Sequence, residues 1–318
     1  MTSYSELSTR EAYGKILVEL GKDNPDIVVL DADLSRSTMT KYFAQAFPER
    51  FIQCGLAEQN MIGIAAGLAS CGKIPFVSTF AVFASSRCFD QVRMCLAQPK
   101  TNVKVVATHG GITVGEDGSS HQAIEDLGLY CSLPNVTVIA PSDAIETVEV
   151  IKAVVSFKGP CYVRLGRPAT PVVYGNGCHF KIGKADVLRE GYDIAIIATG
   201  IMVAKALQAA EHLSQSNIGC RVINMSTLKP IDERSIIDAA EATGAVVTAE
   251  EHLLHGGLGS IVAQVLSHNK PVPMESIGIK DTYCKSGKPE ELLAIHGLTS
   301  DDIQSTVNRV LLKKLHNQ

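Results

Sequence analysis

Short apolar runs alternate with longer stretches of helical spacing along most of the 318-residue chain. In the first half, the apolar runs predict strands over residues 26–34, 51–56, 74–80, 103–108, 136–141 and 161–166. The stretches around and between them predict helices over residues 6–21, 57–72, 84–97 and 142–157. Strands that alternate with helices need crossover connections, so this pattern indicates a mainly parallel sheet.

The alternation is interrupted after Arg167 by a stretch rich in proline, glycine and polar residues, as is typical of a linker. It then resumes with strands expected over residues 193–200, 220–226 and 245–252, and helices over 201–215, 231–242 and from about 257. We therefore expect an α/β protein made of two open, mainly parallel α/β-sheet domains. The expected division is a first domain over residues 1–172, a linker over 173–184 and a smaller domain over 185–318.

Composition narrows the class of protein further. The chain has 29 basic and 33 acidic residues, a net charge of −4, and no run of lysine or arginine of the kind that binds nucleic acid. Its nine cysteines are an odd number without a Cys-x-x-Cys pair, which favours reduced core thiols. The N-terminus lacks the apolar region of a signal peptide, and no apolar stretch reaches the roughly 18 residues of a membrane span. We expect a cytoplasmic protein that contacts neither nucleic acid nor membrane.

Candidate site residues gather where the predicted strands end. In open parallel sheets, ligands bind beside the carboxyl ends of the strands. The residues expected at these ends in the first domain are Asp31, Asp33, Ser35 and Ser37, then Glu58, Phe80, Phe83, Arg164 and Arg167.

The loop THGGITVGEDGSSHQ, which follows the strand over 103–108, is the most unusual of these segments. It allows three interpretations: a metal site, a phosphate cradle, or one wall of an active site that another chain completes. Twelve positions separate His109 from His121 and no compact ligand motif is present, so a metal site is disfavoured. The Gly-Lys-Ser/Thr ending of a phosphate-binding P-loop is also missing, and we expect no metal to be held by this chain.

Glu58 begins a helix whose sequence, NMIGIAAGLAS, is apolar around most of its circumference. A carboxylate in a first helical turn is ordinary, because the helix dipole stabilises it. A helix with so apolar a surface is expected to be buried, however, and its carboxylate with it. A buried carboxylate needs a partner or a raised pKa, and both are common at functional sites, so the structural and functional interpretations stay open.

Several motifs, taken in order, resemble the C-terminal half of transketolase over nearly the whole chain. They are STREAYG, DADLSRST, GLAEQNMIG, STFAVFASSR, THGGITVGEDGSSHQ, NVTVIAPSDA and TAEEHLLHGGLGS. The resemblance implies a thiamine diphosphate pyrimidine-binding domain followed by the transketolase C-terminal domain. The family's Gly-Asp-Gly motif, which holds a divalent metal (Mg or Ca) on the cofactor's diphosphate, does not occur in this sequence. The resemblance therefore implies a separate N-terminal subunit that holds the metal, self-association through both domains into a heterotetramer, and no activity of this chain alone.

The resemblance also implies roles for single residues around the cofactor. Glu58 matches the catalytic glutamate, which hydrogen-bonds the cofactor's aminopyrimidine ring. Phe80 and Phe83 match its aromatic pocket, and Asp33 is placed with these cofactor-binding residues. A third aromatic residue of many transketolases is replaced here by Ser86.

The substrate residues implied by the resemblance form two groups. Arg10, Ser37, His109 and Arg167 match the group that grips the phosphate end of the substrate. Asp117 and His121 match residues that contact substrate hydroxyls near the reacting carbonyl, and His121 is also counted as catalytic. The expected substrates are sugar phosphates, in central pentose phosphate metabolism or in a dedicated catabolic route.

The activity that the resemblance implies is transfer of a two-carbon ketol unit from a ketose phosphate to an aldose phosphate. Two alternatives remain: a beta-type subunit of a thiamine-dependent 2-oxoacid decarboxylase or dehydrogenase, and a non-catalytic orphan half. In the second domain, the cluster Glu250, Glu251 and His252 has no catalytic counterpart in the family, which favours a role in packing and interfaces.

Overall fold

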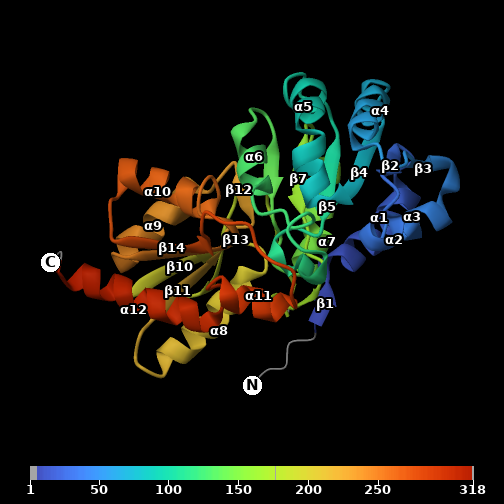
Figure 1. The fold of residues 1–318 in the computed structure, drawn as a ribbon. Helices are drawn as coiled ribbons and strands as arrows, with labels where there is room; N and C mark the ends of the chain where they lie inside the picture. The colour runs from blue at the N-terminus through green and yellow to red at the C-terminus, as the bar shows by residue number, and fades with distance from the viewer. Residues whose placement is uncertain (1–5, 176, 317–318) are drawn as a thin grey trace.

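A computed structural model describes residues 6–175 and 177–316 as two α/β units that lie side by side (Figure 1). The first contains a seven-stranded sheet in the order β12-β6-β7-β5-β4-β2-β3. Its strands are β2 (Ile27–Asp31), β3 (Phe51–Gln53), β4 (Ile74–Phe80), β5 (Lys104–Thr108), β6 (Thr137–Ile139), β7 (Cys161–Arg164) and β12 (Thr227–Lys229). All neighbours pair in parallel except β12 and β6.

The second unit contains a five-stranded sheet in the order β14-β13-β10-β11-β9. Its strands are β9 (Asp186–Arg189), β10 (Ile194–Ala198), β11 (Cys220–Asn224), β13 (Val246–Leu253) and β14 (Met274–Ile279). Only β9 runs antiparallel to its neighbour in this sheet. The prediction of two open, mainly parallel sheets is therefore confirmed, whereas the exact domain limits stay a prediction.

The helices of the first unit are α1 (Thr9–Asp23), α2 (Ser35–Thr38), α3 (Lys41–Ala46), α4 (Glu58–Ser70), α6 (Asp126–Ser132) and α7 (Ala144–Ser156), with short 3-10 turns η1 (Pro48–Arg50) and η4 (Ile112–Asp117). Three of the four helices predicted for the first unit are present, as α1, α4 and α7, and the fourth is divided. The single helix predicted over 84–97 is instead three pieces: π-helical η2 (Phe83–Arg87), α5 (Phe89–Gln91) and π-helical η3 (Val92–Ala97). π-Helical turns often occur at functional sites, and η2 carries one of the predicted site residues, Phe83.

Local signals explain much of this agreement. Helix α7 begins where the side chain of Asp143 accepts the backbone N–H of Glu146 at 2.8 Å, as expected of a helix cap. Strand β2 is buried at all five positions, which is why it reads as a continuous apolar run.

The helices of the second unit are α8 (Met202–Ser214), α9 (Glu233–Thr243), α10 (Leu258–Asn269), α11 (Pro289–Ile295) and α12 (Ser300–His316).

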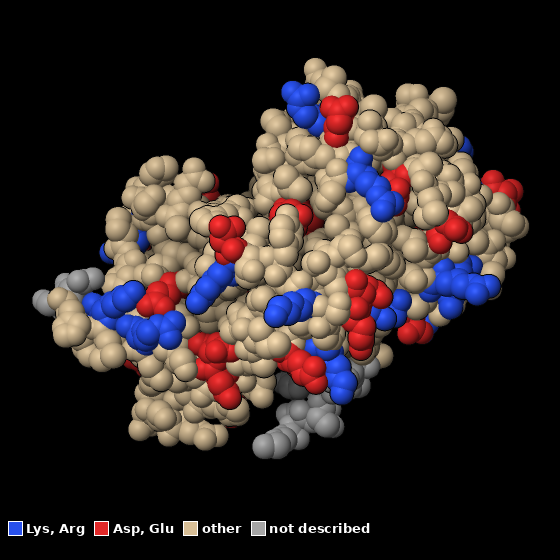
Figure 2. Space-filling view, in the orientation of Figure 1, with Lys and Arg blue, Asp and Glu red and all other residues tan. Residues whose placement is uncertain are grey.

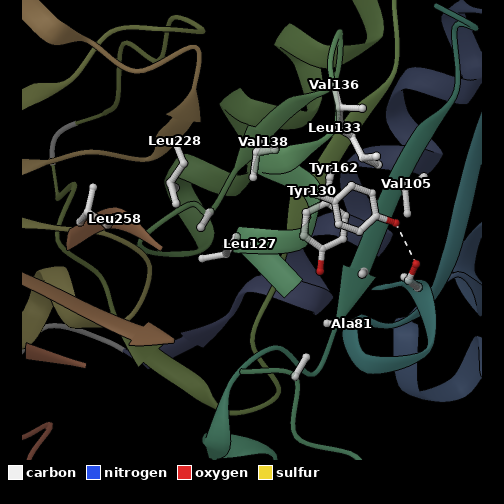
Figure 3. Close-up of a cluster of buried hydrophobic side chains, with 14 of the residues drawn as sticks. Ala81, Val105, Leu127, Tyr130, Leu133, Val136, Val138, Tyr162, Leu228 and Leu258 are labelled. Carbon is white, nitrogen blue, oxygen red and sulfur yellow. Dashed lines mark hydrogen bonds between the residues drawn. The ribbon is translucent and has the colours of Figure 1, made fainter. Parts of the chain in front are cut away.

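The two units share one hydrophobic core at their junction. Strand β12 belongs to the second half of the sequence but pairs antiparallel with β6 at the edge of the first sheet. Its Leu228 and Leu258 of α10 belong to the same buried cluster as Leu127 and Val138 (Figure 3). In that cluster Tyr130 also stacks on Tyr162, with ring centroids 3.8 Å apart. Because core residues from both halves pack together, the second unit has a fixed place relative to the first.

The strands β1 (Glu6–Ser8) and β8 (Ala169–Pro171) form a small antiparallel pair that brings the start of α1 next to the end of the first domain.

No helix within residues 6–175 and 177–316 combines the length and apolarity needed to cross a bilayer. Basic and acidic side chains are interspersed over the face shown in Figure 2, so neither sign dominates that face.

Helix α4 differs from its expected environment. Four of its residues are buried: Glu58, Met61, Ile62 and Ala65. The positions of Gly63 and Gly67 are exposed, with no neighbouring atoms within 4 Å of where a side chain would begin. The prediction that the whole helix is buried is thus wrong for this chain, because the side of the helix that carries the two glycines has no neighbour among the described residues.

Candidate functional site

The site is assembled at the carboxyl edge of the first sheet, where the register of the strands decides which residues meet. Phe80, the last residue of β4, pairs with Thr108, the last residue of β5. The next residue, His109, therefore lies beside the Phe80 ring, and the two rings stack with centroids 3.8 Å apart and planes 24° apart.

Four rings come together here, and we refer to Phe80, Phe83, His109 and His121 as the aromatic group. Phe80 and Phe83 are stacked, with centroids 5.7 Å apart and planes 16° apart. His121 approaches Phe80 and Phe83 edge-on, at 6.2 Å and 5.4 Å. Such a group offers flat apolar faces with polar ring nitrogens beside them, which suits a heteroaromatic ligand.

Glu58 lies at the start of α4, and its side chain is only 2% exposed. The expectation that a buried carboxylate here needs a partner is met by Arg87, whose Nη1 lies 2.8 Å from Glu58 Oε1. The guanidinium also lies over the ring of Phe83, 3.9 Å from its centroid. Arg87 was not predicted as a site residue, although its spacing of four positions from Phe83 on one helical turn could have suggested it.

Arg10 and Arg167 lie together at the other end of the site. Arg10 donates through Nε to the carbonyl oxygen of Arg167 at 3.1 Å and through Nη1 to the carbonyl oxygen of Ser37 at 2.9 Å. Partial burial and the positive charge of Arg167 lower the pKa of Arg10. The two positive charges therefore repel each other, and an anion placed between them relieves that repulsion.

A hollow of about 340 Å³ opens beside these two arginines. Its lining residues come from both units: Ser8, Arg10, Thr113, Val114, Glu116, Arg167, Pro168, Ala169 and Pro289. Arg167 donates to the carbonyl oxygen of Val114, and its Nη1 lies 3.3 Å from Asp117 Oδ2 and 3.8 Å from Glu116 Oε2. These ion pairs are partly exposed, so each contributes little to stability and an anionic ligand can compete with them.

His109 is the buried member of the aromatic group that stacks on Phe80 and lies near the two arginines. Burial and the nearby charges of Arg10 and Arg167 lower its pKa to about 3, so its imidazole is neutral at physiological pH. Its Nδ1 lies 2.8 Å from the hydroxyl oxygen of Thr108. His121 makes a similar contact, 2.9 Å from Nδ1 to the Ser120 hydroxyl.

The predicted residues are therefore brought together with one exception. Glu58 and the aromatic group form one end of the site, and Arg10, Ser37, Asp117 and Arg167 form the other. The side chain of Asp33 is exposed and makes no hydrogen bond or ion pair to another described residue, while its backbone N–H donates to Gln53 at 2.7 Å. Its place in a cofactor pocket stays a prediction, as do the individual roles of the other residues.

No group of three or more histidine, cysteine, aspartate or glutamate side chains within 6–175 and 177–316 is arranged to hold a metal ion. The two histidines of the loop instead belong to the aromatic group. The site as described thus supplies one buried carboxylate, flat ring faces and a pair of cations.

Comparison with known proteins places this site in a family. The family model of the transketolase pyrimidine-binding domain matches residues 5–172, and that of the transketolase C-terminal domain matches residues 183–303. The chain belongs to the transketolase family, which is thiamine diphosphate-dependent. Within that family it corresponds to the C-terminal section.

Three relatives illustrate this likeness. A putative transketolase C-terminal section from Methanocaldococcus jannaschii is 48% identical over 308 residues, 96% of each chain. The 6-deoxy-6-sulfo-D-fructose transketolase subunit SqwH from Clostridium sp. is 42% identical over 305 residues, 96% of this chain and 95% of that one. A solved structure described as a split gene transketolase, inactive beta4 tetramer, has a TM-score of 0.90 and 51% identity, and the match covers 98% of this chain and 100% of that one. Several other transketolase relatives are longer, and this chain spans about half of their length.

Proposed function

We propose that this chain is one subunit of a two-subunit transketolase, which transfers a two-carbon ketol unit from a ketose phosphate to an aldose phosphate. The observation that carries the proposal is the arrangement along one sheet edge. A buried carboxylate and stacked rings lie at one end, and a pair of arginines lies at the other. A separate N-terminal subunit completes the site.

The residues at the Glu58 end fit the aminopyrimidine ring of thiamine diphosphate. In the described part of the chain no hydrogen bond engages Oε2 of Glu58, so that oxygen can accept a proton donor of the ring. Phe80 and Phe83 offer ring faces against which an aminopyrimidine can pack. When bound, thiamine diphosphate supplies the electron sink for breaking and forming the carbon–carbon bond. The divalent metal (Mg or Ca) on its diphosphate is assigned to the N-terminal subunit.

The residues at the arginine end bind the terminal phosphate of the sugar. Each guanidinium of Arg10 and Arg167 presents a planar fork that can donate two hydrogen bonds to a phosphate. His109, which is neutral, adds a polar contact without adding charge. His121 and Asp117 lie on the same loop and contact substrate hydroxyls. Asp117 does so beside Arg167, whereas His121, in the aromatic group, exchanges a proton with the substrate near the reacting carbonyl.

One side of helix α4 is exposed and supports assembly with other chains. This side carries Gly63 and Gly67, and the helix itself begins at Glu58. Glycines leave room for another backbone to approach closely. We infer that another chain covers this side and closes the cofactor site, in a heterotetramer with two copies of each subunit. The inactive beta4 tetramer of the related split gene transketolase supports the dependence on an N-terminal partner.

A second candidate substrate class is a ketose with a terminal sulfonate, as in the name of the clostridial relative. Glu116 lines the hollow together with the two arginines and lowers its net positive charge, which favours a singly charged end group. By contrast, pyruvate and branched-chain 2-oxoacids have no distal anion for Arg10 and Arg167, so a decarboxylase of these 2-oxoacids is disfavoured. A non-catalytic role is also disfavoured, because a buried carboxylate such as Glu58 and a buried, neutral histidine such as His109 are typical of functional sites.

The experiment that tests the proposal reconstitutes this chain with the N-terminal transketolase subunit of the same organism. Fructose 6-phosphate serves as donor and ribose 5-phosphate as acceptor, and fructose and 6-deoxy-6-sulfofructose replace the donor in parallel assays. We expect transfer by the pair, none by this chain alone, and a loss of about 10²-fold or more in kcat for Glu58→Gln. The control is Glu49→Gln, which changes an exposed glutamate. Near-normal transfer by Glu58→Gln contradicts the proposed mechanism.

A further inference from the structure

The loop that carries His109, Asp117 and His121, which we call the substrate loop (residues 109–121), is held by the second unit. Glu251 of β13 is buried, and its Oε1 accepts the backbone N–H of Thr113 at 2.7 Å. A carboxylate that accepts a backbone N–H in a buried place makes a stronger hydrogen bond than a neutral acceptor. The contact joins residues that are 138 positions apart in the sequence.

The backbone at Gly111 is shaped around this carboxylate. Its φ is +82°, and a Cβ there would lie 2.1 Å from the Glu251 carboxyl carbon. Any side chain at this position thus meets both a strained backbone and the carboxylate. Glu251 consequently sits directly against the loop backbone between His109 and Thr113.

Contacts from a second segment of the same unit hold the rest of the loop. Ser286 lies against Gly118, where its hydroxyl oxygen would be 2.5 Å from an added Cβ. Pro289 lies against Gly115 in the same way, at 3.3 Å. Just beyond the loop, Gln122 donates through Nε2 to the carbonyl oxygen of Lys285 at 3.1 Å. The substrate loop is thus supported along its length by the C-terminal domain.

The neighbouring acid, Glu250, has a different task. Its two carboxylate oxygens accept the backbone N–H groups of Leu258 and Gly259, each at 2.7 Å. These groups belong to the first turn of α10, so Glu250 caps a helix of its own domain and makes no hydrogen bond to the described part of the substrate loop. The two adjacent buried glutamates form a natural pair for comparison.

We propose that Glu251 is a positioning residue for the transfer reaction: it fixes the substrate loop so that His109, Asp117 and His121 meet the sugar phosphate. This inference rests on the proposed function, because it takes the loop to contact substrate. It gives the C-terminal domain a part in building the site, in addition to assembly. A displacement of about 1 Å in a positioned group is enough to cost about 10²-fold in rate.

Steady-state kinetics of the reconstituted enzyme test this with Glu251→Ala, Glu251→Gln and Glu250→Gln. We expect Glu251→Ala to lower kcat/KM about 10- to 100-fold, with a higher KM for the ketose phosphate. Glu251→Gln keeps a carbonyl oxygen that can accept the Thr113 N–H, so it recovers most of that loss. Glu250→Gln is expected to change kcat/KM less than about 2-fold, even if it lowers the melting temperature as much as Glu251→Ala does.

Hydrogen exchange on this chain alone gives a readout that does not depend on activity. Amides of the substrate loop are expected to exchange at least about 10-fold faster in Glu251→Ala than in the unmodified chain. In Glu250→Gln the faster amides are expected at Leu258 and Gly259 instead. If Glu251→Ala does not accumulate as folded protein, the same comparison is made between Glu250→Gln and Glu251→Met, which keeps the length of the side chain but lacks the acceptor oxygens.

Unchanged loop exchange in a Glu251 variant that lacks the acceptor oxygen overturns the proposal, and so does an equal loosening of the loop by Glu250→Gln. Kinetic losses that follow melting temperature alike in all variants overturn it as well. If the unmodified pair shows no ketol transfer, the proposed function fails, and the exchange data still decide whether Glu251 fixes the loop.

Discussion

Two ion pairs of the first domain, Glu58–Arg87 and Asp126–Arg164, have nearly the same length but opposite surroundings. Glu58 and Arg87 lie 2.8 Å apart, with the carboxylate side chain 2% exposed and the arginine side chain 49% exposed. Asp126 and Arg164 lie 3.0 Å apart, with side chains 0% and 7% exposed. One pair opens to solvent on its cationic side, and the other is closed on both sides.

The closed pair is surrounded by further contacts that tie the two units together. Tyr162 donates its hydroxyl to Asp126 at 2.6 Å. Arg164 donates through Nη2 to the carbonyl oxygens of Ala123 and Glu251, both at 2.9 Å, and Glu251 belongs to the second unit. The guanidinium of the open pair stacks on Phe83, and within the described residues it donates to no acceptor other than Glu58. A cation that can move away without unfolding its surroundings leaves the carboxylate for a ligand, whereas one held from several sides forms part of the scaffold.

The largest expected effect comes from breaking the closed pair. Arg164→Met leaves the buried Asp126 carboxylate without its cation, and we expect a loss of about 3–5 kcal/mol in the free energy of unfolding. Urea unfolding of this chain measures it. The control is Lys73→Met, which breaks the exposed pair between Lys73 and Asp26 at 3.0 Å and is expected to cost less than about 1 kcal/mol. Equal losses in the two variants remove the distinction between closed and open pairs.

Breaking the open pair is expected to cost less. Arg87→Met leaves Glu58 buried, but water reaches the place that the guanidinium vacates, so we expect a loss of about 1–2 kcal/mol. Adding Glu58→Gln removes the charge and should reduce the cost of the arginine change, which a double-mutant cycle measures. A loss as large as that of Arg164→Met, or no coupling to Glu58→Gln, contradicts a pair that a ligand can open.

The difference between local and distant contacts explains how much of the fold could be predicted from the sequence. Strands such as β2 and helices such as α7 were predicted because their signals, a buried apolar run and a cap at Asp143, are local. Strand β12 was missed because its three residues pair only with a distant edge, β6. The π-helical turns η2 and η3 were missed because apolar spacing does not distinguish them from an ordinary α-helix.

The sequence motifs indicated which residues belong to the site, whereas the fold showed which other residues contact them. Arg87 was absent from the predicted site because its contact with Glu58 joins residues 29 positions apart. The role of Glu251 depends on a contact between the two domains, which no spacing in the sequence reveals. Helix α4 was expected to be buried because its apolar sequence pattern does not reveal that one side of the helix has no neighbour among the described residues.

The smallest effect concerns two buried histidines, His109 in the site and His252 at the junction. Burial lowers the pKa of His252. Its Nδ1 lies 2.7 Å from the Leu253 carbonyl oxygen, and its Nε2 accepts the Gly128 N–H at 3.2 Å. His109 is kept neutral by burial and by the charges of Arg10, Arg167 and His121, which lower its pKa to about 3. An anion can offset the arginine charges at His109 but cannot change the hydrogen bonds of His252.

The sign of the pH effect follows from the folded pKa of His109 lying below its ordinary value of 6.5. Between pH 6.5 and 3 the His109 side chain binds a proton in the unfolded chain but not in the folded chain. His109 therefore lowers the free energy of unfolding as the pH falls through that range. Between pH 7 and 5.5 its share is about 1 kcal/mol, which His109→Gln should remove from the measured slope. His255→Gln, an exposed histidine, is the control. Added inorganic phosphate should reduce the same slope in the unmodified chain by binding between Arg10 and Arg167, and an identical slope with and without phosphate argues against an anion site beside His109.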